Sequence, residues 1–148
     1  VDSLRQDDID GAQFLYGTPG SIVRPANDAF ANAIALTFAN NVVSVTGSNV
    51  NATKEAGEPN HAPNEPGGAS VWWRRTAPLS GNLAVTTAGS NFDTLLAAYT
   101  GTTVGALTQL AANDDEQAPG TAPEAPRIRT SLITFPVTAG TTYYLAVD

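Results

Sequence analysis

Residues 130–148 read TSLITFPVTAGTTYYLAVD, and this stretch decides the fold class. Ile133, Phe135 and Val137 alternate with Leu132, Thr134 and Pro136, so the two sets fall on opposite faces of a strand. Pro136 has no backbone N–H to donate, which predicts that this strand lies at a sheet edge or at a bulge. The turn that contains Gly140 separates it from a second expected strand, 142–147.

The same pattern continues toward the N-terminus as short apolar segments separated by Gly, Pro, Asn and Asp. The expected strands are 34–38, 42–46, 70–76, 82–87, 94–100, 107–112, 130–137 and 142–147. About eight strands with no long helix between them predict an all-β fold, a β-sandwich of jelly-roll-like type with a short N-terminal helix. Two long loops, 51–69 and 113–129, are expected at the surface and are candidates for function.

The first residues have a different character. Residues 4–17, LRQDDIDGAQFLYG, predict an amphipathic helix that ends at Gly17. They resemble the closing helix of a matrixin-type zinc metalloprotease domain, whose last line runs L-x-x-D-D-I-D-G-I-Q-x-L-Y-G. Residues 1–17 are therefore interpreted as the end of such a domain and residues 18–26 as a linker. The zinc-binding H-E-x-x-H helix of that family is absent from the chain.

Residues 27–148 carry a second resemblance. The segments that carry it are NDAFANAIAL, GSNVNATKEAGEPNHA, GGASVWWRRTAPLSGNLAVTTAGSNFDTLLAAYTG, LAANDDE and ITFPVTAGTTYYLAVD. They resemble the bacterial pre-peptidase C-terminal (PPC-like) family, which consists of β-sandwich modules appended to secreted enzymes. Arg75 stands where relatives usually carry an aromatic or apolar residue. Relatives continue past YYLAVD into one more strand, so this sandwich is expected to be one strand short.

Composition narrows the functional class. The chain has 148 residues, of which 42% are hydrophobic, enough for one domain with its own core. Its formal net charge of −7, with seven scattered Lys and Arg, excludes a basic stripe for nucleic acid. No apolar run reaches the roughly 20 residues of a membrane span. There is no Cys. Low Lys content with abundant Asn, Thr, Gly and Ala is compatible with a secreted bacterial protein, and an extracellular location is expected.

Catalysis is not expected from these residues. His61 is the single histidine, and it lies in the Pro- and Gly-rich loop GEPNHAPNEPGG, where we expect it to be a solvated loop residue. A nucleophile and an oriented base would have to lie within hydrogen-bond reach of each other, and no motif around His61 indicates this. Close carboxylate pairs are common in surface loops and do not indicate glycoside hydrolysis.

Calcium is the expected cofactor, since hard cations take six to eight oxygen ligands and the loops supply oxygen-rich clusters. The candidate ligands are Asn27, Asp28, Glu55, Glu58, Asp93, Asp114 and Asp115. The resemblance implies the Asn27–Asp28 pair together with Glu55 or Glu58. The alternative is that these groups only cap and turn the chain, with Asn27 capping the turn AFANA and Asp114 and Asp115 forming an Asx turn.

The VWWRR segment, residues 71–75, suggests a ligand-binding surface. Adjacent residues on a strand point to opposite faces, so Trp72 and Trp73 cannot share one core. An outward indole beside Arg74 or Arg75 could stack on a sugar ring or on a protein side chain. The alternative, which we favour, is that both indoles are covered, since large aromatic side chains are mostly buried.

Taken together, the sequence predicts a non-catalytic accessory domain of a secreted protein, whose parent resembles a metalloprotease. Its expected work is attachment, substrate targeting or stabilisation, and its expected partner is an extracellular protein or polysaccharide. The alternative is an assembly subunit that binds another copy of itself by strand addition at the edge left open by the missing strand. Oligomeric state discriminates the two, since a tethered binding domain is monomeric.

Overall fold

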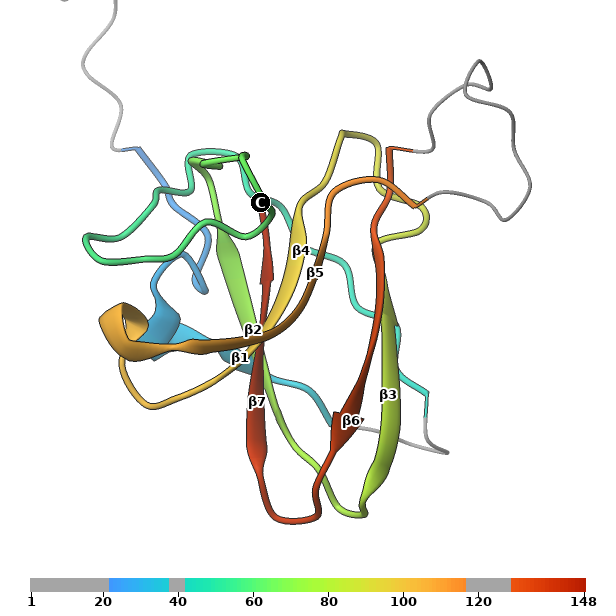
Figure 1. Cartoon of the computed structure of the whole chain (residues 1–148). Coiled ribbons are helices and arrows are strands. Elements are labelled where there is room, and N and C mark those ends of the chain that lie inside the picture. The colour runs from blue at the N-terminus through green and yellow to red at the C-terminus, as the bar shows by residue number, and fades with distance from the viewer. Residues whose placement is uncertain (1–21, 38–41, 117–128) are drawn as a thin grey trace, which may run out of the picture.

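The computed structural model describes residues 22–37, 42–116 and 129–148. Within them the fold is mostly β, with two sheets and no α-helix (Figure 1). One sheet has five strands in the order β1-β2-β7-β4-β5, and the other pairs β3 with β6. The strands are β1 (Ile34–Ala35), β2 (Val71–Thr76), β3 (Gly81–Thr86), β4 (Leu96–Thr100), β5 (Thr108–Asn113), β6 (Leu132–Val137) and β7 (Thr142–Val147). Two 3-10 turns complete the elements, η1 (Phe30–Asn32) and η2 (Val104–Ala106).

The chain passes between the sheets four times, from β2 to β3, from β3 to β4, from β5 to β6 and from β6 to β7. Two of these connections, β2 to β3 and β6 to β7, lie next to each other. The two connections are hydrogen-bonded to each other, because Ala77 N–H donates to Thr141 O at 2.9 Å and Gly140 N–H donates to Ala77 O at 2.8 Å. Gly140 has φ +80, a conformation that side-chain-bearing residues rarely adopt. The stretch that decides the fold class therefore forms two strands of different sheets, joined by a glycine turn.

A hydrophobic core lies between the two sheets. Its buried members are Ala77, Leu96, Ala98, Ile133, Phe135, Tyr143 and Leu145. Within β6, Ile133 and Phe135 are buried, while Leu132, Thr134 and Pro136 are exposed, which confirms the expected alternation. β6 has β3 as its only strand partner among the described residues, which agrees with the edge position expected from Pro136.

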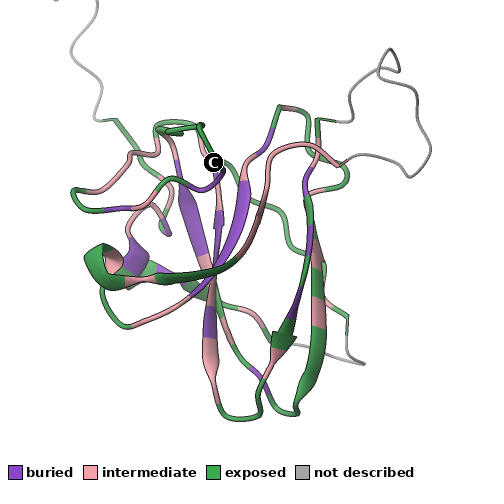
Figure 2. Cartoon of the chain, viewed as in Figure 1, coloured by how far each residue is buried: buried purple, intermediate pink, exposed green. Residues whose placement is uncertain are grey.

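The opposite side of the five-stranded sheet carries a second core, which we call the aromatic face. Its buried members are Phe30, Ala33, Trp72, Ala97, Tyr99 and Ala146. β4 shows why the sheet is covered on both sides, because Leu96 and Ala98 belong to the first core and Ala97 and Tyr99 to the second. All four have 0% exposure. Figure 2 shows that buried residues concentrate on β2, β4 and β7.

Two sequence-based expectations about the elements need comment. Seven of the eight expected strands form, with small shifts of their ends, but the expected strand 42–46 is wrong: only Val42 makes an isolated bridge, and 43–49 have no regular structure. β-propensity depends on a neighbouring strand to pair with, and the Val-rich sequence alone does not supply one. The expected N-terminal helix at residues 1–17 and residues 18–21 of the expected linker 18–26 lie outside the described residues.

Candidate functional site

Three aspartates converge at one end of the five-stranded sheet. Antiparallel pairing of β4 and β5 places Leu96 opposite Asn113, so the residues just before β4 and just after β5 come together. This brings Asp93 close to Asp114 and Asp115. One carboxylate oxygen from each lies within 4.8 Å of the others. The sheet register thus assembles an acidic cluster from Asp93 and two aspartates that lie 21 and 22 positions later in the sequence.

The cluster opens onto a pocket of about 920 Å³. Its lining includes two more carboxylates, those of Glu65 and Asp148, so five acidic side chains border one space. The positive side chain of this lining is Arg129, whose Nη1 lies 4.0 Å from Asp93 Oδ2, with both side chains more than half exposed. An exposed pair at this distance contributes little, and like charges crowded together favour a bound cation.

Asp148 is held in the pocket wall by the backbone of a neighbouring loop. Its carboxylate accepts hydrogen bonds from Gly68 N–H at 2.8 Å and Ala69 N–H at 3.0 Å. Its backbone exchanges two hydrogen bonds with Leu95. Gly67 has φ +61, and a Cβ there would collide with the Asp148 carboxylate. Asp148 therefore ties the end of β7 to the loop beside the acidic cluster.

An acidic triad of this kind could hold a metal ion. Carboxylate oxygens are the ligands that hard cations take, and neighbouring backbone carbonyls and water can complete six to eight positions. Of the seven ligands expected from the sequence, Asp93, Asp114 and Asp115 are the three brought together. Asn113 Nδ2 donates to Asp115 O at 3.1 Å, so a side-chain-to-backbone hydrogen bond also shapes this turn.

The Asn27–Asp28 pair lies elsewhere, at the start of the described chain. Asn27 is buried, and its Nδ2 donates to Trp72 O at 2.9 Å. It does not cap η1, whose N-cap is Ala29 without a side-chain hydrogen bond, so the capping hypothesis for Asn27 is wrong. Asp28 Oδ1 accepts from Thr53 N–H at 2.5 Å. These groups fasten the segment before η1 to β2 and to the following loop.

Glu55 and Glu58 also bind backbone amides. Glu55 Oε2 accepts from Phe30 N–H at 2.6 Å, and Glu58 Oε2 accepts from Glu55 N–H at 2.7 Å. The other Glu58 oxygen lies 2.7 Å from His61 Nε2. We therefore assign the candidate cation site to Asp93, Asp114 and Asp115 alone.

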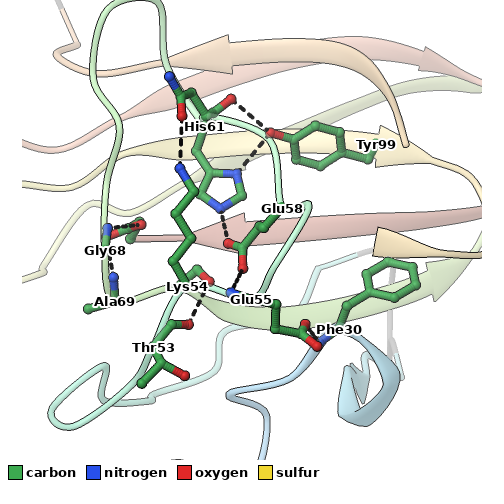
Figure 3. Close-up of polar contacts among 12 residues, drawn as sticks. Phe30, Thr53, Lys54, Glu55, Glu58, His61, Gly68, Ala69 and Tyr99 are labelled. Atoms are coloured by element: carbon green, nitrogen blue, oxygen red, sulfur yellow. Dashed lines mark hydrogen bonds and ion pairs between the residues drawn. The ribbon is translucent and has the colours of Figure 1, made fainter. Parts of the chain in front are cut away.

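His61 is the residue whose surroundings the sequence did not predict. The expectation of a solvated loop histidine is wrong, because His61 has 0% exposure. Its Nε2 faces Glu58 and its Nδ1 lies 2.8 Å from the Tyr99 hydroxyl, as Figure 3 shows. Burial by itself raises the pKa of Glu58, but hydrogen bonds from His61, Ser70 and the Glu55 N–H outweigh it and hold this pKa below its ordinary value.

Tyr99 completes the network from β4. Its hydroxyl accepts from Gln109 Nε2 at 3.1 Å and lies 3.3 Å from Asn60 O. Burial raises the pKa of Tyr99 to about 12. The rings of His61 and Trp72 meet edge to face with centroids 5.3 Å apart. Since the imidazole is enclosed by these groups, the network holds a loop on the sheet and offers no open path to a substrate.

The VWWRR residues divide between the two faces of β2. Trp72 has 0% exposure on the aromatic face, so an external ligand cannot reach its indole in this structure. Trp73 is half-buried and packs against the core between the sheets. Arg74 is exposed on the surface, while Arg75 is half-buried, and burial lowers its pKa. The adjacent tryptophans thus occupy opposite cores, as strand geometry requires.

Comparisons of the chain with protein-family models, with curated proteins and with solved structures find no match. In the described part of the chain, no helix has the length and apolar character needed to cross a membrane. The acidic cluster and the buried histidine network are therefore the features from which function is inferred.

Proposed function

We propose that this chain is a non-catalytic accessory domain of a secreted bacterial protein, with a jelly-roll-like β-sandwich fold, and that it binds calcium at Asp93, Asp114 and Asp115. The observation that carries the proposal is the convergence of the three carboxylates at one end of the sheet. The resemblance of residues 27–148 to PPC-like modules supports the accessory role. Attachment, substrate targeting or stabilisation of the parent protein is the work it would do, toward an extracellular protein or polysaccharide.

Calcium is the cation that this chemistry favours. All three converging side chains offer oxygen, and calcium tolerates irregular geometry at loops, whereas magnesium demands near-ideal octahedral coordination. The site joins the loop before β4 to the end of β5, so a bound ion would fasten two segments that the sheet brings together. Binding only to the folded state would raise thermal stability by mass action.

Thermal unfolding tests this role. The wild-type chain is expected to melt at a higher temperature in millimolar calcium than in chelator, and Asp114→Asn is expected to abolish the difference. Glu65→Gln is the matched control, because it removes one carboxylate from the same pocket without touching the triad. Equal melting temperatures of the wild type in both conditions would count decisively against a stabilising calcium site.

The second candidate function is assembly by strand addition, and a specific observation favours it. A groove of about 1000 Å³ borders β3 and the five-stranded sheet. Its lining includes Leu83 and Val85 of β3, residues 42–49, and Leu96 and Leu145 of the five-stranded sheet. β3 pairs with β6 alone among the described residues. A strand edge beside an apolar groove is a template for another strand.

The place of this edge differs from the one expected at the end of the chain. β7 is paired on both sides, by β2 and by β4, so its backbone offers no open edge. The described residues 22–24 do not form a strand either, since Asn51 Nδ2 donates to Val23 O and Arg24 contacts Asp28 and Thr53. Light scattering distinguishes the candidates: a monomer at high concentration excludes self-assembly.

A further inference from the structure

Residues 50–69 form a loop that packs His61 against Trp72 and Tyr99 of the aromatic face and buries few side chains of its own. Figure 3 shows the contact between His61 and Tyr99. Within this 50–69 loop, only Glu58, His61 and Ala62 are buried. Ala62 is therefore the one apolar side chain that the loop buries. Apolar burial gives little free energy at this contact, so polar bonds must hold the loop in place.

Most of those bonds end on carboxylates. Asp28 accepts from the Thr53 amide, Glu55 from the Phe30 amide, and Asp148 from the Gly68 and Ala69 amides. Within the loop, Glu58 accepts from the Glu55 amide and from His61, which in turn contacts Tyr99 on the sheet. An ionised carboxylate accepts these hydrogen bonds through both oxygens, whereas a protonated carboxyl group has one O–H that donates instead. A carboxyl group that gains a proton loses part of this capacity, so acid weakens the attachments of the loop together.

The sheet beneath is held differently. β2, β7 and β4 are joined by continuous backbone ladders, and their aromatic face packs Trp72, Tyr99 and Ala146 at 0% exposure. Neither backbone ladders nor apolar packing titrates in mild acid. The loop and the sheet are therefore expected to respond to pH at different points.

We propose that the 50–69 loop is an acid-released cover of the aromatic face, with the contacts of His61 to Glu58 and Tyr99 as its latch. Above the ordinary carboxyl range the latch is closed, because the Glu58 carboxylate accepts from both the Glu55 amide and His61. In acid, a protonated Glu58 no longer accepts from both donors, so the buried His61 loses the contact that holds it in place against Tyr99. The loop then leaves the sheet and uncovers Trp72 and Tyr99.

The direction of the pH effect on loop closure follows from the Glu58 carboxyl. Its pKa in the folded chain lies below the ordinary value of 4.5, so its contribution to closure is complete above pH 4.5 and is lost as the pH falls through the folded pKa. Release is therefore expected below pH 4.5.

Few other charged or titratable groups face the latch. Within the loop, Lys54 Nζ donates to Asn60 Oδ1 at 2.8 Å, and the Glu55 carboxylate points to Phe30. From the sheet, β4 contributes the phenol of Tyr99, and its neighbours Trp72 and Gln109 are uncharged. Tyr99 stays uncharged between pH 3 and 7, because burial raises its pKa to about 12. Protonation of the Glu58 carboxyl thus accounts for the response.

Hydrogen exchange followed by mass spectrometry, expressed as protection factors from pH 7 to pH 3 in chelator, tests the proposal. The chelator removes any contribution from a bound cation, so the result is independent of the calcium proposal. In the wild type, amides of the 50–69 loop are expected to lose protection below pH 4.5 while β2, β4 and β7 keep theirs. Trp72 fluorescence in a Trp73→Phe background is expected to change over the same range.

Two variants separate the latch from general acid effects. Glu58→Gln is expected to lower loop protection at pH 7 and to flatten its pH dependence. Glu65→Gln, which removes an exposed carboxylate of the same loop, is expected to follow the wild type. The proposal is overturned if loop and sheet lose protection at the same pH in the wild type, or if Glu58→Gln and Glu65→Gln give the same profile.

Discussion

The Tyr99 hydroxyl is the single group through which β4 holds the buried histidine. It lies 2.8 Å from His61 Nδ1, and its pKa is raised to about 12 by burial. The phenolate form is disfavoured in the folded chain because its charge would lie among Trp72 and other rings with little water. Alkaline pH therefore tests how firmly this phenol is enclosed.

We predict that the stability contributed by Tyr99 is complete below pH 10 and is lost as the pH rises toward 12. The pKa of the phenol is near its ordinary value of 10.0 in the unfolded chain and about 12 in the folded chain, so the unfolded state releases its proton first. Urea unfolding of the wild type and of Tyr99→Phe at pH 8, 10 and 11 measures this effect. The difference between the two should shrink with rising pH, and a constant difference would contradict the enclosure of the phenol.

At the scale of single residues, the sequence did not predict that His61 is buried. His61 sits in a loop rich in Pro and Gly, and the only local signal is Glu58 three residues before it. Its other partners, Tyr99 and Trp72, lie 38 and 11 positions away in the sequence, on strands that only the fold brings near. Asp93, Asp114 and Asp115 were predicted as ligands individually, but their grouping depends on the register of β4 and β5.

At the scale of elements, the segment 42–49 shows how a strand-forming sequence is used without a ladder. It lies along the groove beside β3, and Gly47 approaches the Trp73 ring so closely that a Cβ would lie 2.9 Å from Cζ2. Real Cβ atoms do not come so near without a shift of one partner. Gly47 therefore lets the segment cover a tryptophan that the core only half-buries.

Gly47→Ala is predicted to destabilise the chain by about 1–3 kcal/mol, the usual cost of forcing extra volume into a packed contact. Gly81→Ala is the control, since a Cβ at Gly81 meets nothing within 4 Å and its φ is not positive. Chemical denaturation with Trp fluorescence measures both. If the two variants are equally stable, the segment does not press on Trp73 in solution.

The apolar pattern of each element explains which strands the sequence could predict. Strands in the sheets have alternating or continuous apolar residues that match their burial, such as β6 with Ile133 and Phe135 inside. Residues 42–46 carry the same Val-rich signal, yet whether they pair depends on a neighbour that no local pattern specifies. The central position of β7 was likewise not readable from TTYYLAV, because the order of strands is a property of the whole sheet.

For the molecule as a whole, part of the negative net charge is concentrated in the acidic cluster. The chain carries a formal net charge of −7, and five of its carboxylates border the pocket at one end of the five-stranded sheet. Like charges in one place lower stability unless a cation compensates them. A divalent cation bound at this end is therefore expected to raise the stability of the protein, while the 50–69 loop on the aromatic face is expected to respond separately to acid.

Isothermal titration calorimetry with calcium chloride tests the central claim most directly. The chelator-treated, dialysed wild type is predicted to bind one calcium ion per chain, Asp114→Asn is predicted to show no measurable heat of binding, and Glu65→Gln is predicted to bind as the wild type does. The absence of binding by the wild type up to millimolar calcium, or unchanged binding by Asp114→Asn, would contradict a calcium site at Asp93, Asp114 and Asp115.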